Sequence, residues 1–202
     1  MDLTKIDVPN ESQKEELRFA AFAEAPGPYE MKAKKPLVPY APSGKMWNRL
    51  LYVVGIRRRN VYVGNFCHTQ LPGNDTEKLW KVTPKGNFKT AEGWNDLVER
   101  FRSTLRSLEC QAVLLLGETP LVGLFGPDHR LGDTRGYPFY WEDKLIIPTH
   151  HPASMLPGRS PSNFWLTYFD IHKLLRIQSE GRRVDFDYNV WIPGRGEVIE
   201  SL

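Results

Sequence analysis

Apolar residues are grouped along the chain in two alternating patterns. Four short runs are apolar at most positions, as expected for strands covered on both faces of a sheet; they are LRFAAFA (17–23), NVYVGN (60–65), AVLLLG (112–117) and LIIPTHH (145–151). Other segments repeat apolar residues every three or four positions, which predicts helices at 43–55, 91–108, 119–125 and 163–177. The alternation predicts an α/β protein with a three-layer α/β/α fold and a central four-stranded parallel sheet.

Local signals refine the first predicted helix and one connection between predicted elements. Ser43 is the expected N-cap of the first helix, which should end near Gly55. The stretch 68–89 is rich in Pro, Gly, Asn, Thr and Lys, so we expect a long irregular connection there.

The length of 202 residues favours one domain, 1–202, with its core at about 17–177. The C-terminal tail, 184–202, is expected to pack on this core or to contact a partner through its aromatic residues, which are Phe186, Tyr188 and Trp191.

Composition restricts the class of protein without identifying it. The formal net charge of +3 permits a local nucleic-acid-binding patch but does not indicate one. The two cysteines, Cys67 and Cys110, form no CxxC motif, so no disulfide framework or metal-ligand set is visible. No apolar run reaches the length of about 18 residues that spans a membrane, and the start of the chain lacks the features of a signal peptide. We expect a soluble, cytoplasmic, monomeric protein.

Polar side chains follow each predicted strand. In an open α/β sheet, ligands bind beyond the carboxyl ends of the strands. Taken singly, Glu24 has an ordinary role as a helix cap, Asn65 as a turn residue and His151 as a buried histidine before a proline. Their joint placement at the ends of three predicted strands favours a shared site instead. The residues at the four strand ends are Glu24, Asn65, Gly117 with Glu118, and Thr149 with His150 and His151.

Three motifs at these strand ends resemble those of one enzyme family. They are AEAPGPYE (23–30), VYVGNFCHTQLPGN (61–74) and THHPASML (149–156). Together with KKPLVPYAPSGKMWNRLL (34–51), they resemble the uracil-DNA glycosylase superfamily, most closely its family 4 members, over about residues 17–177.

The resemblance implies a role for each matching residue. Glu24 matches a catalytic carboxylate, Asn65 the carboxamide that contacts the extruded base, and His151 the imidazole that stabilises charge on the departing base. The implied substrate-binding residues are Ala25, Pro26, Gly27, Glu30, Leu37 and Tyr40, with Glu30 helping to exclude a C5 methyl group. The implied DNA-binding residues are Gly44, Lys45, Ser154, Met155, Leu156 and Arg159. Met155 and Leu156 are either an apolar wedge that enters the duplex or ordinary core-facing residues.

The sequence departs from the family pattern at two places. Family 4 enzymes hold an iron–sulfur cluster with four cysteines, whereas this chain has Thr69 at one ligand position and too few cysteines elsewhere. We therefore expect no cofactor and no metal. Leu37 replaces a phenylalanine that stacks on uracil in the family, with Tyr40 nearby. This change leaves room for a base larger than uracil.

These observations lead to one hypothesis and two alternatives. The hypothesis is a monofunctional DNA glycosylase that flips a pyrimidine, uracil first, out of DNA and hydrolyses its N-glycosidic bond, leaving an abasic site. The first alternative applies the same chemistry to a hypermodified base of phage DNA, as an anti-phage defence. The second is a catalytically silent nucleic-acid-binding relative. The expected partner is DNA in every case.

Overall fold

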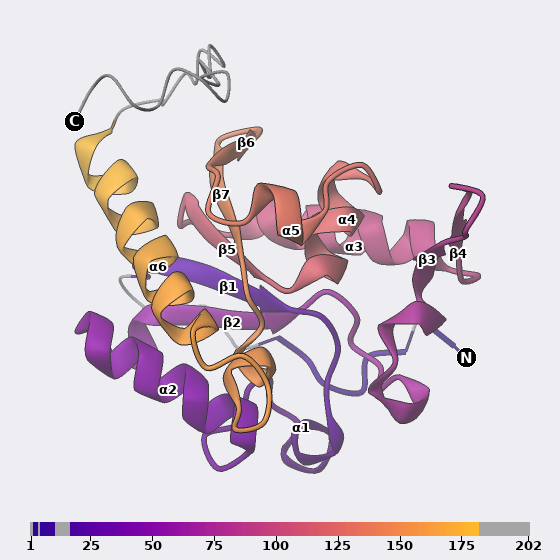
Figure 1. Cartoon of the computed structure of the whole chain (residues 1–202), viewed down its shortest axis with the longest axis horizontal. Coiled ribbons are helices and arrows are strands. Elements are labelled where there is room, and N and C mark those ends of the chain that lie inside the picture. The colour runs from indigo at the N-terminus through magenta and orange to yellow at the C-terminus, as the bar shows by residue number, and fades with distance from the viewer. Residues whose placement is uncertain (1, 4, 11–16, 182–202) are drawn as a thin grey trace, which may run out of the picture.

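The computed structural model describes residues 2–3, 5–10 and 17–181 (Figure 1). Its main sheet has the strand order β2-β1-β5-β7-β6. The strands are β1 (Phe19–Ala23), β2 (Val61–Asn65), β5 (Ala112–Leu116), β7 (Lys144–Thr149) and β6 (Phe139–Trp141). The first four are parallel, which confirms the predicted parallel sheet, and β6 adds an antiparallel fifth strand at one edge. Strand β6 was not predicted because it is only three residues long and half-buried.

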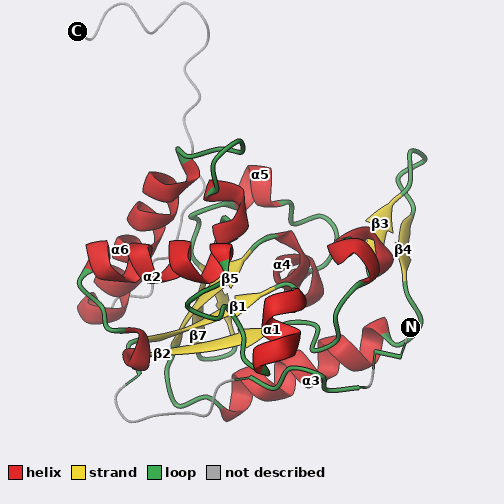
Figure 2. Ribbon diagram, turned by 90° about the horizontal axis from the view of Figure 1, so that it is seen from below, coloured by secondary structure: helices red, strands yellow, loops and turns green. Residues whose placement is uncertain are grey.

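Helices cover both faces of this sheet, as predicted for three layers (Figure 2). Helices α2 (Pro42–Val54) and α6 (Asn163–Glu180) pack on one face. Helices α3 (Trp94–Ser107) and α4 (Glu118–Phe125) pack on the other. Successive side chains of a strand point to opposite faces, so Phe22 of β1 enters the α3/α4 core and Ala21 the α2/α6 core. Every residue of β1, β2, β5 and β7 is buried, because both faces are covered.

Two local predictions were wrong. Helix α2 is capped by Ala41 and not by Ser43, because Pro42 occupies the first helical position, where its missing N–H costs nothing. The stretch 68–89 is not fully irregular. It holds short 3-10 turns at Pro72–Asn74 and Thr76–Lys78, and most of an antiparallel hairpin of β3 (Trp80–Val82) and β4 (Phe88–Thr90). Five of these six strand residues are exposed, so no alternation of buried and exposed positions marks the hairpin.

The remaining short elements are helices α1 (Pro28–Ala33) and α5 (Leu131–Thr134) and the 3-10 turns Arg58–Asn60 and Pro152–Met155. The predicted tail, 184–202, lies outside the described residues. Within the described part of the chain, no helix is long and apolar enough to cross a membrane.

Candidate active site

The sheet brings the three predicted catalytic residues to one edge. Ala23 of β1 is paired in register with Asn65 of β2, so Glu24 follows directly beside Asn65. On the other side, the Gly117 N–H donates to the Thr149 carbonyl at 2.9 Å, which aligns the end of β5 with the end of β7, two residues before His151. Parallel strands end at the same edge, so a carboxylate, a carboxamide and an imidazole gather there.

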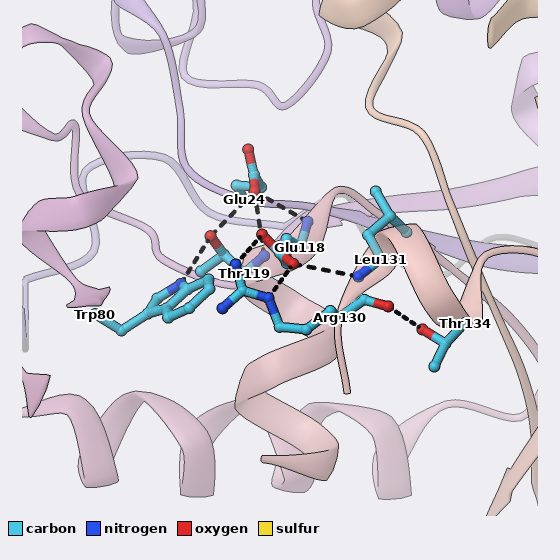
Figure 3. A network of polar contacts seen from close by, with 7 residues as sticks. All are labelled: Glu24, Trp80, Glu118, Thr119, Arg130, Leu131 and Thr134. Carbon is cyan, nitrogen blue, oxygen red and sulfur yellow. Dashed lines mark hydrogen bonds and ion pairs between the residues drawn. The ribbon is translucent and has the colours of Figure 1, made fainter. Parts of the chain in front are cut away.

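Glu24 is held by the first turn of α4 (Figure 3). Its Oε1 accepts hydrogen bonds from the Glu118 N–H at 3.2 Å, the Thr119 N–H at 3.1 Å and the Thr119 hydroxyl at 3.0 Å. The N-terminal turn of a helix has free N–H groups and a positive dipole end, so it favours a carboxylate. Gly117 makes this approach possible, because a Cβ at that position would lie 2.7 Å from Glu24 Cδ.

A second carboxylate fixes the same helix end from outside. Glu118 Oε1 forms an ion pair with Arg130 Nε at 2.8 Å and accepts the Leu131 N–H at 3.2 Å. The Arg130 guanidinium also lies over the Trp80 ring, 5.3 Å from its centroid. These contacts connect α4, α5 and the β3–β4 hairpin around the turn that receives Glu24 (Figure 3).

Asn65 presents an unpaired carboxamide. The residue is 1% exposed, and its backbone N–H donates to Asn10 Oδ1 at 3.0 Å. Among the residues that the structure describes, none forms a hydrogen bond with Asn65 Oδ1 or Nδ2. Leaving a buried amide unpaired costs about 1–3 kcal/mol, so native proteins keep such groups for a reason. A side-chain amide has one hydrogen-bond acceptor group and two donor hydrogens, so it can pair with the hydrogen-bonding edge of a base.

One ring nitrogen of His151 accepts a hydrogen bond, which leaves the other nitrogen as the donor. Its Nδ1 accepts the Ala153 N–H at 3.1 Å, so a neutral ring carries its proton on Nε2. Burial lowers the pKa of His151; the Glu24 charge raises it and the Arg159 charge lowers it further. The imidazole is therefore neutral at pH 7. Ser154 holds the following loop, because its hydroxyl donates to the His151 carbonyl at 2.8 Å and accepts from Asn163 Nδ2 at 3.1 Å.

Glu30 serves as a clamp between two backbone segments. Its carboxylate accepts the Gly27 N–H at 2.6 Å and, through the other oxygen, the Leu37 N–H. Burial raises the pKa of Glu30, and these two hydrogen bonds and the charge of Arg58 oppose the rise. The clamp ties the turn of Ala25, Pro26 and Gly27 to the loop before α2. Pro26 is buried, and Ala25 and Gly27 are half-buried.

The predicted site residues in the loop before α2 and in the first turn of α2 differ in burial. Leu37 is 1% exposed and packs in the α2/α6 core. Tyr40 is 55% exposed and its ring meets that of Tyr29 edge-on at 6.3 Å. Gly44 is buried in α2, where a Cβ would lie 1.8 Å from the Val38 carbonyl oxygen, so close packing alone requires glycine there.

The predicted DNA-binding residues divide into exposed and buried ones. Lys45 and Arg159 are exposed, and Leu156 is half-buried. Met155 is 3% exposed and belongs to the α2/α6 core, which is the second of the two interpretations given above for this residue. Of the predicted DNA-binding residues in this loop, Leu156 and Arg159 are therefore more accessible than Met155.

The family match covers this fold and site together. A model of the Uracil DNA glycosylase superfamily matches residues 9–171, which include all four parallel strands and all three motifs, so the chain belongs to that superfamily. Membership implies a glycosylase-like function with DNA as the substrate. A type-4 uracil-DNA glycosylase from Thermotoga maritima is 29% identical to the chain over 167 residues, which cover 81% of this chain and 80% of the relative.

The residues present do not fit an iron–sulfur cluster of the family 4 kind. The sequence contains two cysteines. Cys67 follows β2 and Cys110 precedes β5, so they lie at opposite ends of parallel strands. Burial raises the pKa of both thiols, that of Cys110 to about 11, whereas cluster ligands are thiolates. Thr69, at an expected ligand position, instead donates its hydroxyl to the Lys5 carbonyl at 2.8 Å.

Two groups of residues support the site in ways that were not predicted, although Thr149 was named among the strand-end residues. Thr119 contacts Glu24 directly, and Trp80 contacts Thr119. No local sequence pattern connects either residue to Glu24. Thr149 donates its hydroxyl to the buried Asp170 at 2.6 Å, and Asp170 is paired with Arg135 at 2.8 Å. This second group anchors the end of β7 just before His151. The sequence signals for this second group were Thr149, a polar residue at a strand end, and Asp170, an aspartate among the apolar positions of a predicted helix.

Proposed function

We propose that the protein is a monofunctional DNA glycosylase that extrudes a pyrimidine, uracil first, and hydrolyses its N-glycosidic bond. The unpaired carboxamide of Asn65 carries this proposal. Uracil presents an N3–H donor beside the O4 acceptor, and one amide can pair with both. Cytosine reverses the donor and the acceptor at these two positions, so the same amide orientation disfavours it.

Glu24 and His151 supply the opposite charges that bond cleavage requires. As the bond between C1′ and N1 breaks, its electron pair goes to the base and positive charge develops on the sugar. The Glu24 carboxylate stabilises that charge and accepts a proton from the water that bonds to C1′. The Nε2–H of the neutral His151 donates to O2 of the departing base and stabilises its negative charge. The base anion then takes up a proton from solvent and Glu24 releases its proton to solvent, so the products are an abasic site and the free base.

The remaining site residues position DNA around this reaction. The clamp of Glu30 keeps the turn after Glu24 against the loop before α2. Leu156 fills the space that the extruded nucleotide leaves, and Lys45 and Arg159 meet phosphates. Leu37 suggested room for a larger, modified base, but its side chain is 1% exposed and packs in the core, so we propose uracil as the substrate.

The test measures single-turnover release of abasic sites, read as alkali-cleaved product, from matched duplexes with and without uracil. Asn65→Leu removes the amide from a site where it is unpaired. We expect excision to fall by about 100-fold or more while stability stays equal or rises, because an apolar side chain avoids the cost of the buried amide. His151→Gln should reduce excision similarly, whereas the control His172→Gln, at an exposed position of α6, should not.

Each outcome assigns the protein to one of the three hypotheses. Uracil release by the parent protein, with loss in Asn65→Leu and His151→Gln, supports the proposal. No release from uracil, with release from phage DNA that carries modified bases, transfers the same chemistry to another base. Binding of every DNA without any abasic product identifies a silent relative and refutes the proposed function.

A further inference from the structure

A directed chain of two hydrogen bonds reaches Glu24 from the β3–β4 hairpin. Trp80 Nε1 lies 3.2 Å from Thr119 Oγ1, and Thr119 Oγ1 lies 3.0 Å from Glu24 Oε1 (Figure 3). An indole N–H only donates and a carboxylate only accepts. The Thr119 hydroxyl must therefore accept from Trp80 and donate its one proton to Glu24. If the hydroxyl proton pointed away from Glu24, the hydrogen bond between Thr119 Oγ1 and Glu24 Oε1 would be lost.

The burial of Thr119 and Trp80 strengthens this chain of hydrogen bonds. Thr119 is fully buried and Trp80 is 7% exposed, so water does not compete for the hydroxyl. Hydrogen bonds in such a setting are stronger than in water and polarise one another along a chain. Because Thr119 also donates its backbone N–H to the same oxygen, it provides two of the three donors on Glu24 Oε1.

We propose that Thr119, oriented by Trp80, is a positioning residue that fixes the Glu24 carboxylate for the reaction. The hydroxyl holds Oε1 and thereby sets the rotation of the carboxyl group, so that Oε2 faces the sugar and the water. The β3–β4 hairpin acts on the reaction through Trp80 without contacting substrate. This inference rests on the proposed function for its kinetic consequence, but the contact itself is testable without catalysis.

Three variants separate positioning from general structural support. Thr119→Val keeps the side-chain shape and the backbone N–H but removes the hydroxyl, and we expect the single-turnover excision rate to fall about 10-fold or more with unchanged affinity for DNA. Thr119→Ser restores the hydroxyl and should restore the rate. Trp80→Phe removes the indole donor together with part of the ring that contacts Arg130 and Phe88, and a loss of about 3-fold is expected.

The double variant tests whether the two residues act in one chain. If Trp80 acts only through the Thr119 hydroxyl, Thr119→Val with Trp80→Phe is no slower than Thr119→Val alone. Multiplied losses would overturn the chain. The control Thr104→Val removes a hydroxyl that bonds only its own helix, the Arg100 carbonyl at 2.9 Å, and should leave excision unchanged.

A spectroscopic measurement keeps the inference testable if no uracil is released. The side-chain carboxyl ¹³C resonance of Glu24, assigned by its loss in Glu24→Gln, should move in Thr119→Val and stay in place in Thr119→Ser. An unmoved resonance in Thr119→Val would refute the positioning role, whatever the substrate of the enzyme. A moved resonance without activity on uracil would leave the positioning role standing and refute uracil as the substrate.

Discussion

We expect Gly117→Ala, compared with Gly126→Ala, to separate backbone strain from displacement of Glu24, the carboxylate that we propose to be catalytic. Gly117 has φ +97° and ψ −178°, a conformation that only glycine adopts readily, and Gly126 at the other end of α4 has nearly the same angles, φ +94° and ψ 171°. Alanine should cost about 1–3 kcal/mol of strain at either position. Each kcal/mol lowers Tm by about 2–4 °C for a protein of this size.

The two positions differ in what the new methyl group meets. At Gly126 a Cβ has no heavy atom within 4 Å, whereas at Gly117 it lies 2.7 Å from Glu24 Cδ and 2.9 Å from Oε1. Ordinary contact begins at 3.4 Å, so Glu24 Cδ must retreat by 3.4 − 2.7, which is about 0.7 Å. A shift approaching 1 Å at a reacting group costs up to about 100-fold in rate, so we expect a loss of 10-fold to 100-fold in Gly117→Ala.

The assay is single-turnover uracil excision, with Tm measured on the same samples. Gly126→Ala should lose stability to a similar extent and keep the parental excision rate. A parental rate in Gly117→Ala would show that the position of Glu24 does not limit the reaction. An equal loss of rate in Gly126→Ala would show that strain in α4, and not displacement of Glu24, explains the effect.

Three further predictions follow from burial and hydrogen bonding. Met155→Ala should lower the free energy of unfolding by about 2–5 kcal/mol, as for a core residue, whereas Leu156→Ala should weaken duplex binding with little effect on urea unfolding; the reverse pattern would contradict the assignment of the loop. Glu30→Gln should cost about 1–3 kcal/mol, because an amide cannot accept both N–H groups, and the exposed control Glu92→Gln should cost nothing measurable by thermal melting. Burial lowers the pKa of His68, His150 and His151 from their ordinary value of 6.5, so the unfolded chain binds protons first and stability should fall as the pH drops from 6.5 towards the lower folded values. Urea unfolding at pH 7.5 and about pH 5.5 measures this loss, and His68→Gln should reduce it; an unchanged loss would exclude His68 as a contributor.

The positions of the main strands, and of the residues that we propose to be catalytic, were readable from the sequence. The run AVLLLG is apolar throughout because β5 is covered on both faces, and the residues at the ends of such runs must meet at one edge of a parallel sheet. Glu24, Asn65 and His151 follow from that rule together with the family resemblance. These features repeat along the chain or lie at a fixed offset from an element, so local order is enough to find them.

The tertiary structure decided which residues support the site. Trp80 lies 39 residues from Thr119, and Thr119 lies 95 residues from Glu24, so no periodicity links them. The same holds for the burial of Met155, which depends on α2 and α6 packing over its loop. Local propensity and spacing act over a few residues, whereas hydrogen-bond direction, close approach and burial depend on which distant segments the fold brings together.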